Sequence, residues 1–260
     1  DLDLIFVYDH AKDAVGSDGA RPLAPSLYFA RASQRLISAL TVMTGEGGLY
    51  EVDMRLRPSG NKGPVAVSFE TFAKYQAEEA WTWERLALTR ARVVAGPGHV
   101  CEQVEAVIRG ALTVPRDRVQ VLADVADMRS RLDRERAAKS VWDLKEAKGG
   151  LFDVEFIAQG LQLVGGESVL APNTLTALRA LSKGLDAADA RELDAAALLY
   201  LNVMQVLRLT VEGSFVPGEA SASLQALIAR VAGLGSFGEV ELKPDQHADF
   251  ERHHAGERQR

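Results

Sequence analysis

The chain has 260 residues, of which 47% are hydrophobic and 25% are charged, and its formal net charge is −6. This balance is typical of a globular chain with enough apolar mass for one large or two modest domains. It argues against a nucleic-acid-binding protein, because affinity for phosphate backbones comes from clustered Lys and Arg side chains. The single Cys101 excludes an internal disulfide and fits a reducing compartment. No apolar run approaches the roughly 18 residues of a membrane span, so we predict a cytoplasmic protein.

The first 97 residues combine strand and helix patterns. Alternation of apolar residues predicts strands at residues 1–8, 49–56 and 65–67. Apolar residues at helical spacing predict helices at residues 25–44, 68–79 and 80–94, with Ser68 as an N-cap. A tight turn rich in Pro and Gly separates the second and third strands, which we therefore expect to pair with each other. The result is a small mixed β-sheet covered by helices.

Beyond the break at Gly96, Pro97 and Gly98, nearly every segment has helical periodicity. Helices are predicted at residues 100–112, 121–136, 153–164, 173–181, 187–212 and 220–231. Residues 245–260 are too polar to be assigned a core role, and the tail over residues 236–260 is expected to be poorly ordered. We therefore predict the α+β class, with a mixed core over residues 1–97 and an all-α domain over residues 98–260.

Two short segments allow a functional and a structural interpretation. Trp81 and Trp83 are two positions apart and cannot share one helix face, so we expect at least one of them in the core rather than in a ligand site. Lys148, Gly149 and Gly150 resemble a phosphate-binding loop but lack its full spacing, and they are expected instead to begin the next helix.

Three carboxylates lie on the first two predicted strands. Asp1 and Asp3 project from one face of the first strand, because side chains alternate along a strand, and Asp53 lies in the second. Clustered hard oxygen ligands suit Mg²⁺, which takes one or two protein carboxylates and completes its shell with water and phosphate oxygens. Arg55 and Arg57 follow Asp53 and would add positive charge beside bound phosphates. The pattern predicts a metal and nucleotide site.

Each of these residues also has a purely structural alternative. Asp1 and Asp3 would then be solvated acids at the end of a strand. Asp53 would pair with Arg55 or Arg57, since an unpaired charge among apolar neighbours is costly. For the two arginines, the sequence is equally compatible with phosphate binding and with structural ion pairing.

Several motifs occur together and in a defined order, which makes their combination more specific than two aspartates alone. They are Asp1-Leu2-Asp3, Val52-Asp53-Met54-Arg55-Leu56-Arg57-Pro58-Ser59-Gly60, Trp81-Thr82-Trp83-Glu84, and residues 87–94, 148–159 and 171–175. Through them, residues 1–235 resemble the glutamine synthetase adenylyltransferase family of the nucleotidyltransferase-fold superfamily. Members of this family regulate nitrogen metabolism.

The resemblance implies a nucleotidyltransferase core that moves AMP from ATP to a tyrosine of glutamine synthetase. It places Asp1, Asp3 and Asp53 on the metal-binding carboxylates of a two-metal-ion site that uses Mg²⁺ or Mn²⁺. Asp1 and Asp3 would hold the nucleotide-bound ion, and Asp53 would help to activate the incoming hydroxyl. The implied partners are glutamine synthetase and a nitrogen-signalling regulatory protein, which the helical domain would help to dock, with the active cleft where the two domains meet.

Family members carry two such catalytic halves with opposite activities. Residues 50–53 and 80–84 resemble the C-terminal, adenylylating half more than the half that removes AMP by phosphorolysis. The Gly-Ser turn that usually precedes the first aspartate pair has no counterpart before Asp1, so the resemblance implies an N-terminally truncated half whose own turnover is uncertain. The alternatives are the removing half, or a module that only binds glutamine synthetase or a signalling protein.

Overall fold

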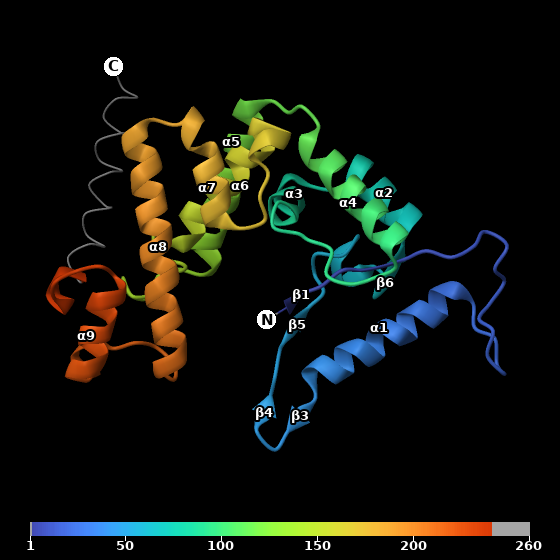
Figure 1. Ribbon diagram of the computed structural model, residues 1–260, viewed down its shortest axis with the longest axis horizontal. Helices are drawn as coiled ribbons and strands as arrows, with labels where there is room; N and C mark the ends of the chain where they lie inside the picture. The colour runs from blue at the N-terminus through green and yellow to red at the C-terminus, as the bar shows by residue number, and fades with distance from the viewer. Residues whose placement is uncertain (1, 241–260) are drawn as a thin grey trace. The chain divides into compact units, whose positions relative to one another are not determined.

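The computed structural model describes residues 2–240 (Figure 1). The chain divides into two compact units, Asp1–Val114 and Pro115–Arg260. The change from one unit to the next therefore comes 17 residues after the expected break at residue 97. Helix α4 (Gly98–Thr113) accounts for the difference, because its Val104 packs with Val67 and Phe72 in the core of the first unit. The Gly- and Pro-rich segment is thus a turn within that unit.

The strands of the first unit are short and pair two by two. They are β1 (Leu2–Asp3), β2 (Phe6–Tyr8), β3 (Met43–Thr44), β4 (Gly47–Gly48), β5 (Val52–Asp53) and β6 (Ala66–Ser68). β1 pairs with β5 and β2 pairs with β6, both in parallel, while β3 and β4 form an antiparallel hairpin. The expected pairing of the second and third strands is therefore wrong. The segment from residue 65 onward pairs with the first strand region instead.

The second strand ends at Asp53, although alternation predicted that it continues to residue 56. The chain turns there, since the N–H of Arg57 donates to the carbonyl of Met54 over 3.3 Å. Pro58 supplies no N–H for a sheet ladder, and Ser59 adopts a left-handed conformation with φ of 61°. The residues after Asp53 thus leave the sheet in a tight turn.

Helices cover these strands. In the first unit they are α1 (Pro25–Thr41), α2 (Phe69–Glu78), α3 (Thr82–Leu88) and α4, with a 3₁₀ turn, η1, at Gly60–Lys62. Ser68 caps α2 as expected, because its hydroxyl accepts a hydrogen bond from the N–H of Thr71 over 3.2 Å. α1 contacts β5 and β6 and lies alongside the strands in Figure 1. Apolar side chains from β2, β6, α2 and α4 form the core.

Helix α3 is held at its start by a buried acid. The Glu84 side chain is 7% exposed and accepts hydrogen bonds from the hydroxyl of Tyr75 (2.8 Å) and the N–H of Trp81 (2.9 Å). The second contact is the reciprocal half of a capping box. Burial and the hydrogen bond to Glu84 raise the pKa of the Tyr75 hydroxyl. Glu84 therefore joins α2 to the first turn of α3.

We expect Glu84→Ala to lower the free energy of unfolding by about 2 kcal/mol, because two partly buried hydrogen bonds to a buried carboxylate are lost. Equilibrium urea unfolding followed by circular dichroism measures this loss. Glu78→Ala is the matched control, since Glu78 is exposed in a 4.0 Å pair with Lys74 and its removal should cost no more than about 0.5 kcal/mol. Equal losses in the two variants would contradict the role of Glu84.

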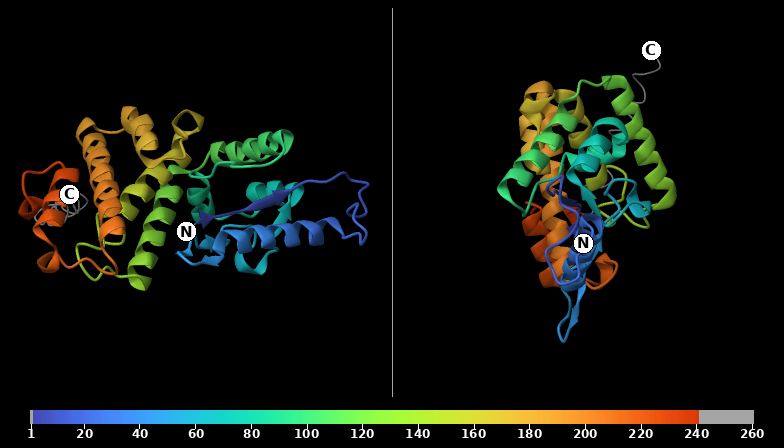
Figure 2. Two further views of the ribbon diagram at one scale, coloured as in Figure 1. Left: turned by 60° about the horizontal axis from the view of Figure 1, so that its bottom comes forward. Right: turned by 90° about the vertical axis from the view of Figure 1, so that its right-hand side faces the viewer.

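The second unit is entirely helical in its described part. Its helices are α5 (Arg118–Glu135), α6 (Leu151–Gly165), α7 (Thr174–Leu181), α8 (Ala187–Thr210) and α9 (Ala222–Val231), with 3₁₀ turns η2 (Glu167–Val169), η3 (Ser182–Gly184) and η4 (Pro217–Glu219). α6 contacts α5, α7 and α8, and α8 lies between α7 and α9 (Figures 1 and 2). Buried side chains of these helices, including Val154, Ala197 and Val203, form one core. Phe237 and Val240 pack in this core, which corrects the expectation of a poorly ordered tail for residues 236–240, whereas residues 241–260 lie outside the described part of the chain. The predicted fold class is confirmed.

The segment before α6 is a helix start, as predicted for Lys148, Gly149 and Gly150. Gly150 is the N-cap, and the N–H of Gly149 donates to a carboxylate oxygen of Asp153 over 2.7 Å. A Cβ atom on Gly150 would lie 2.6 Å from the carbonyl oxygen of Leu144, so only glycine fits here. Among residues 2–240, no helix has both the length and the apolar character required to cross a bilayer.

Candidate functional site

The pairing of β1 with β5 brings two of the predicted carboxylates together. Asp3 is the direct partner of Asp53 in this parallel pair. Hydrogen bonds from the N–H of Leu2 to the carbonyl of Glu51 (2.8 Å) and from the N–H of Leu4 to the carbonyl of Asp53 (2.9 Å) fix the register. Residues paired directly in a parallel ladder project from the same face. Both carboxyl groups therefore lie on one face of the strand pair.

Asp53 is held by the residue two positions further along the chain. One carboxylate oxygen accepts the backbone N–H of Arg55 over 2.8 Å, and the other accepts Nε–H of the same residue over 2.7 Å and also contacts its Nη2. The Asp53 side chain is only 15% exposed. The side-chain hydrogen bond from Arg55 lowers the pKa of Asp53 despite partial burial. Asp53 is therefore an ionised carboxylate that already binds a cation.

Arg55 is exposed, and its charge is influenced by both acids. Its side chain is 65% exposed. The hydrogen bond and charge of Asp53, together with the charge of Asp3, raise the pKa of Arg55. The structural alternative considered for Asp53, an ion pair with Arg55, is thus present. Within residues 2–240 the Arg55 guanidinium is bonded only to Asp53, so its long side chain can move when that carboxylate takes another partner.

Arg57 has a different environment from Arg55. It is buried, with 8% of its surface exposed, and its guanidinium donates to the carbonyls of Met54 (2.5 Å) and Gly63 (3.3 Å). These bonds hold the turn that follows β5. A Cβ atom on Gly63 would lie 2.1 Å from the carbonyl oxygen of Pro58, so the turn is closely packed. Arg57 therefore supports the loop after Asp53, and its contact with phosphate stays a prediction.

The Arg55 ion pair leads to a pH-dependent prediction. Because the folded-state pKa of Asp53 is lowered, its pair stabilises the fold at pH values above the ordinary Asp pKa of 3.8, and this contribution disappears as pH falls through the lower folded-state value. We expect Arg55→Gln to raise the pKa of Asp53 toward its ordinary value, measured by carboxyl-carbon NMR titration. Arg35→Gln, on the exposed face of α1, should leave it unchanged. An unaltered Asp53 titration in Arg55→Gln would refute the assignment.

The donor set fits a magnesium ion bound jointly by protein and substrate. Asp3 and Asp53 provide hard oxygen ligands on one face, and Mg²⁺ needs only one or two protein carboxylates beside water and phosphate oxygens. Asp1, the third predicted ligand, lies outside the described residues. Within residues 2–240, no group of three or more His, Cys, Asp or Glu side chains is arranged to hold a metal by itself. The binding of Asp53 to a guanidinium shows that its carboxylate accepts a cation.

The two tryptophans near α3 are both on the surface, which corrects the expectation that at least one is in the core. Trp81 is 70% exposed and Trp83 is 41% exposed. The predicted helix over residues 80–94 is also shorter, since α3 ends at Leu88. Only Glu84, Leu86 and Leu88 of this helix are buried. A helix of two turns has room for few buried positions, and these three take them.

Comparisons with known proteins match both units. The family model described as "Glutamate-ammonia ligase adenylyltransferase" matches residues 1–107, and the model described as "GlnD PII-uridylyltransferase" matches residues 120–241. The change from one match to the next falls around the boundary between the two compact units. The first match contains Asp1, Asp3, Asp53 and both arginines.

Curated relatives match nearly the whole chain. A "Bifunctional glutamine synthetase adenylyltransferase/adenylyl-removing enzyme" from Mesorhizobium japonicum is 48% identical over 244 residues, which cover 93% of this chain and 25% of the relative. The protein of the same name from Rhizobium meliloti is 49% identical over 238 residues, covering 88% of this chain and 24% of the relative. The protein of that name from Rhodopseudomonas palustris strain TIE-1 is 48% identical over 267 residues, covering 99% of this chain and 27% of the relative. The chain spans about a quarter of the length of these relatives, and it belongs to the glutamine synthetase adenylyltransferase family.

Proposed function

We propose that this chain contributes the adenylylating active site of its family, transferring AMP from ATP to a tyrosine hydroxyl of glutamine synthetase. The direct pairing of Asp3 with Asp53 is the observation that carries the proposal. It places two carboxylates on one face of a strand pair, as a shared metal site requires. The names of the relatives support the reaction and the target. The motifs at residues 50–53 and 80–84 support this direction of the reaction.

In the proposed mechanism, Asp1 and Asp3 would hold the ion bound to the nucleotide, and Asp53 would help to activate the incoming hydroxyl through a second ion. Bound Mg²⁺ or Mn²⁺ would neutralise the phosphates, favour deprotonation of the tyrosine hydroxyl and stabilise the pyrophosphate that leaves. Asp53 suits this role because its lowered pKa keeps it charged. Its carboxylate would exchange the guanidinium of Arg55 for the ion.

Arg55 would then turn from Asp53 to the phosphates of ATP. Its exposed side chain and fixed positive charge suit this movement, and a guanidinium binds phosphate oxygens through two parallel hydrogen bonds. Arg57 would keep the turn behind Asp53 in place through its bonds to Met54 and Gly63. These bonds use two of the five guanidinium N–H groups of Arg57, so a further contact with phosphate stays part of the proposal.

The partners and location follow from the same proposal. Glutamine synthetase is the proposed macromolecular substrate, and the helices of the second unit provide a surface on which it or a nitrogen-signalling regulatory protein would dock. The second unit's match to a family described as a PII-uridylyltransferase supports a regulatory setting. We place the reaction in the cytoplasm.

The proposal is tested by following radioactive AMP from α-labelled ATP onto glutamine synthetase in the presence of Mg²⁺. Because the chain spans about a quarter of its relatives, the assay uses the chain itself and a chimera in which it replaces the matching segment of the Mesorhizobium japonicum protein. We expect label on a tyrosine of the synthetase with at least the chimera. Label that stays absent although the chimera is folded and binds the synthetase would refute the proposal.

A second incubation separates the two directions of the reaction. Adenylylated glutamine synthetase and inorganic phosphate replace the unmodified synthetase and ATP, and ADP is measured. Phosphorolysis that is lost when Asp53 is replaced, without any forward transfer, would assign the chain to the removing activity. If the chain binds the synthetase but catalyses neither reaction, its role is that of an interaction module.

A further inference from the structure

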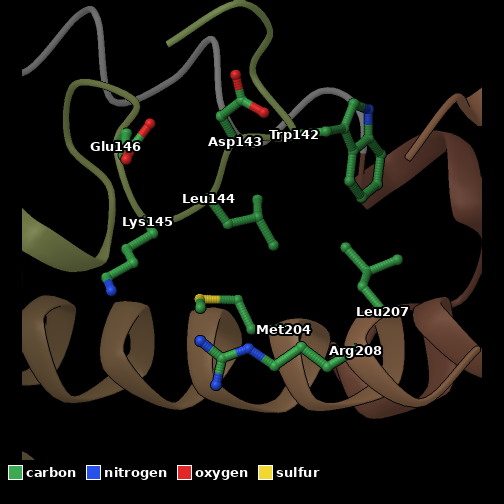
Figure 3. Close-up of a pocket in the computed structure, with 8 residues that line it drawn as sticks. All are labelled: Trp142, Asp143, Leu144, Lys145, Glu146, Met204, Leu207 and Arg208. Atoms are coloured by element: carbon green, nitrogen blue, oxygen red, sulfur yellow. The ribbon is translucent and has the colours of Figure 1, made fainter. Parts of the chain in front are cut away.

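The second unit contains a pocket whose lining includes none of the residues assigned to the proposed active site. It lies between the turn at residues 142–146 and helix α8 and has a volume of about 250 Å³ (Figure 3). Trp142, Leu144, Met204 and Leu207 supply apolar surface to its lining. Ligand pockets commonly exceed about 300 Å³, so this one suits a small molecule.

Two cations reach one end of this pocket. In Figure 3, Lys145 lies at the end opposite Trp142 and Leu207, and the guanidinium of Arg208 is directed toward the same end. Arg208 has no anionic partner among the described residues. Lys145 contacts the face of the Phe152 ring, with its Nζ 5.1 Å from the ring centroid. In the described part of the chain, no acid forms a salt bridge with Lys145. The pocket is therefore apolar at one end and positively charged at the other.

The acids of the same turn do not neutralise these cations. The carboxylate of Asp143 accepts the N–H groups of Lys139 (2.6 Å) and Ser140 (3.1 Å), so it caps the local backbone. Figure 3 shows the carboxylate of Asp143 directed away from α8, and Glu146 farther from that helix in this view than Leu144 and Lys145 are. The cations therefore lie nearer to α8 in this view than the acids do.

The wall of the pocket is held in place before any ligand binds. Arg129 of α5 donates to the carbonyls of Glu146 (3.0 Å) and Ala147 (3.3 Å), and the N–H of Leu151 donates to the carbonyl of Leu144 over 2.8 Å. Because these bonds fix the turn at both sides, little conformational entropy is lost when a ligand binds.

We propose that this pocket binds a small organic anion with an apolar body. The anionic head would contact Lys145 and Arg208, whose guanidinium suits a carboxylate because it donates two parallel hydrogen bonds. The apolar body would lie along Met204 and Leu207 toward Trp142. A straight-chain monocarboxylate of about the length of hexanoate combines these features and serves as the probe.

Trp142 reports on binding directly. Its ring packs edge-on against Phe215, with centroids 4.7 Å apart, and stacks on Phe237 at 5.5 Å, so a ligand beside it changes its fluorescence. Trp81 and Trp83 are replaced by Phe to leave one signal. Butyrate, pentanoate and hexanoate are then titrated, and we expect Kd to fall by up to about fourfold per methylene as each is buried. Hexylamine, which has the same chain with the opposite charge, should not bind.

Variants test the charged end of the pocket. Arg208→Gln and Lys145→Gln should each weaken hexanoate binding about tenfold, the scale of a lost charge-assisted hydrogen bond. Arg191→Gln, an exposed arginine near the start of the same helix, should bind hexanoate as the parent does. The variants are compared only after circular dichroism has shown unchanged helix content, and either cation variant suffices for the test.

Three results would overturn the inference. One is a Kd that does not change with chain length, or equal binding of inorganic phosphate, because the apolar end would then contribute nothing. Another is equal binding of hexylamine and hexanoate. The third is a Kd in Arg208→Gln or Lys145→Gln that equals the value in Arg191→Gln. The inference is supported if Kd falls with increasing chain length and if hexanoate binding weakens only in Arg208→Gln and Lys145→Gln.

Discussion

Replacing Asp53 by Asn is expected to reduce AMP transfer at least about a hundredfold, the scale seen when a group that stabilises transition-state charge is lost. The substitution keeps the shape of the side chain but removes the negative charge that Arg55 now neutralises and that a metal would require. Transfer of label from ATP to glutamine synthetase by the chimera measures the effect.

The variant should remain folded, so the loss can be assigned to chemistry. The partner of Asp53 is 65% exposed, and exposed ion pairs contribute only about 0–1 kcal/mol to stability. Binding of Mn²⁺, measured by electron paramagnetic resonance without ATP, should weaken in Asp53→Asn. Glu46→Gln, in the hairpin turn between β3 and β4, should change neither metal binding nor transfer. Full transfer by Asp53→Asn would remove Asp53 from the site.

Replacing Arg129 by Met is expected to lower the stability of the second unit by about 2 kcal/mol, because breaking a partly buried, hydrogen-bonded ion pair leaves its charged partners unsatisfied. The Arg129 side chain is only 13% exposed and binds Asp153 over 2.6 Å and Asp133. Burial lowers the pKa of Arg129, but the hydrogen bonds and charges of these two acids outweigh that effect and raise the pKa overall. The side chain also donates to two carbonyls of the turn before α6.

Urea unfolding followed by the fluorescence of Trp142, in the background without Trp81 and Trp83, measures this loss. Arg131→Met is the matched control on the same helix. Arg131 pairs with Asp127 over 2.5 Å, but both side chains are more than half exposed, so its removal should cost no more than about 0.5 kcal/mol. A similar small loss in both variants would show that Arg129 does not hold the unit together.

A double-mutant cycle separates the ion pair from simple burial. Arg129 and Asp153 are in direct contact, so we expect the losses of Arg129→Met and Asp153→Asn to be less than additive by more than about 0.5 kcal/mol. Additive losses would mean that the two side chains stabilise the unit independently, through their separate bonds to backbone groups.

The sequence alone determined the local parts of the structure. Helical periodicity and capping residues located every helix from α4 to α9 to within a few residues, because hydrogen bonds and side-chain caps within a helix act over short distances. Alternation likewise identified which side of a strand Asp3 would occupy. Residue types and spacing also suggested Asp1, Asp3, Asp53, Arg55 and Arg57 as site residues, and their roles stay predictions.

Tertiary structure decided what depends on distant partners. Alternation does not tell which strands pair or in what register, so only the fold could place Asp3 directly opposite Asp53 and join β6 to β2. Two arginines that look equivalent in the sequence became an exposed partner of Asp53 and a buried support of the turn, because the chain leaves the strand between them.

The same limit explains the remaining differences. α4 belongs to the first unit because Val104 meets Val67 and Phe72, which are more than 30 positions away and leave no local signal. Trp81 and Trp83 are exposed because α3 is too short to bury them. The pocket of the second unit brings Lys145 beside Arg208 from segments about 60 residues apart. Local patterns set the helices and the chemical character of the acids, whereas long-range packing alone decided which side chains meet.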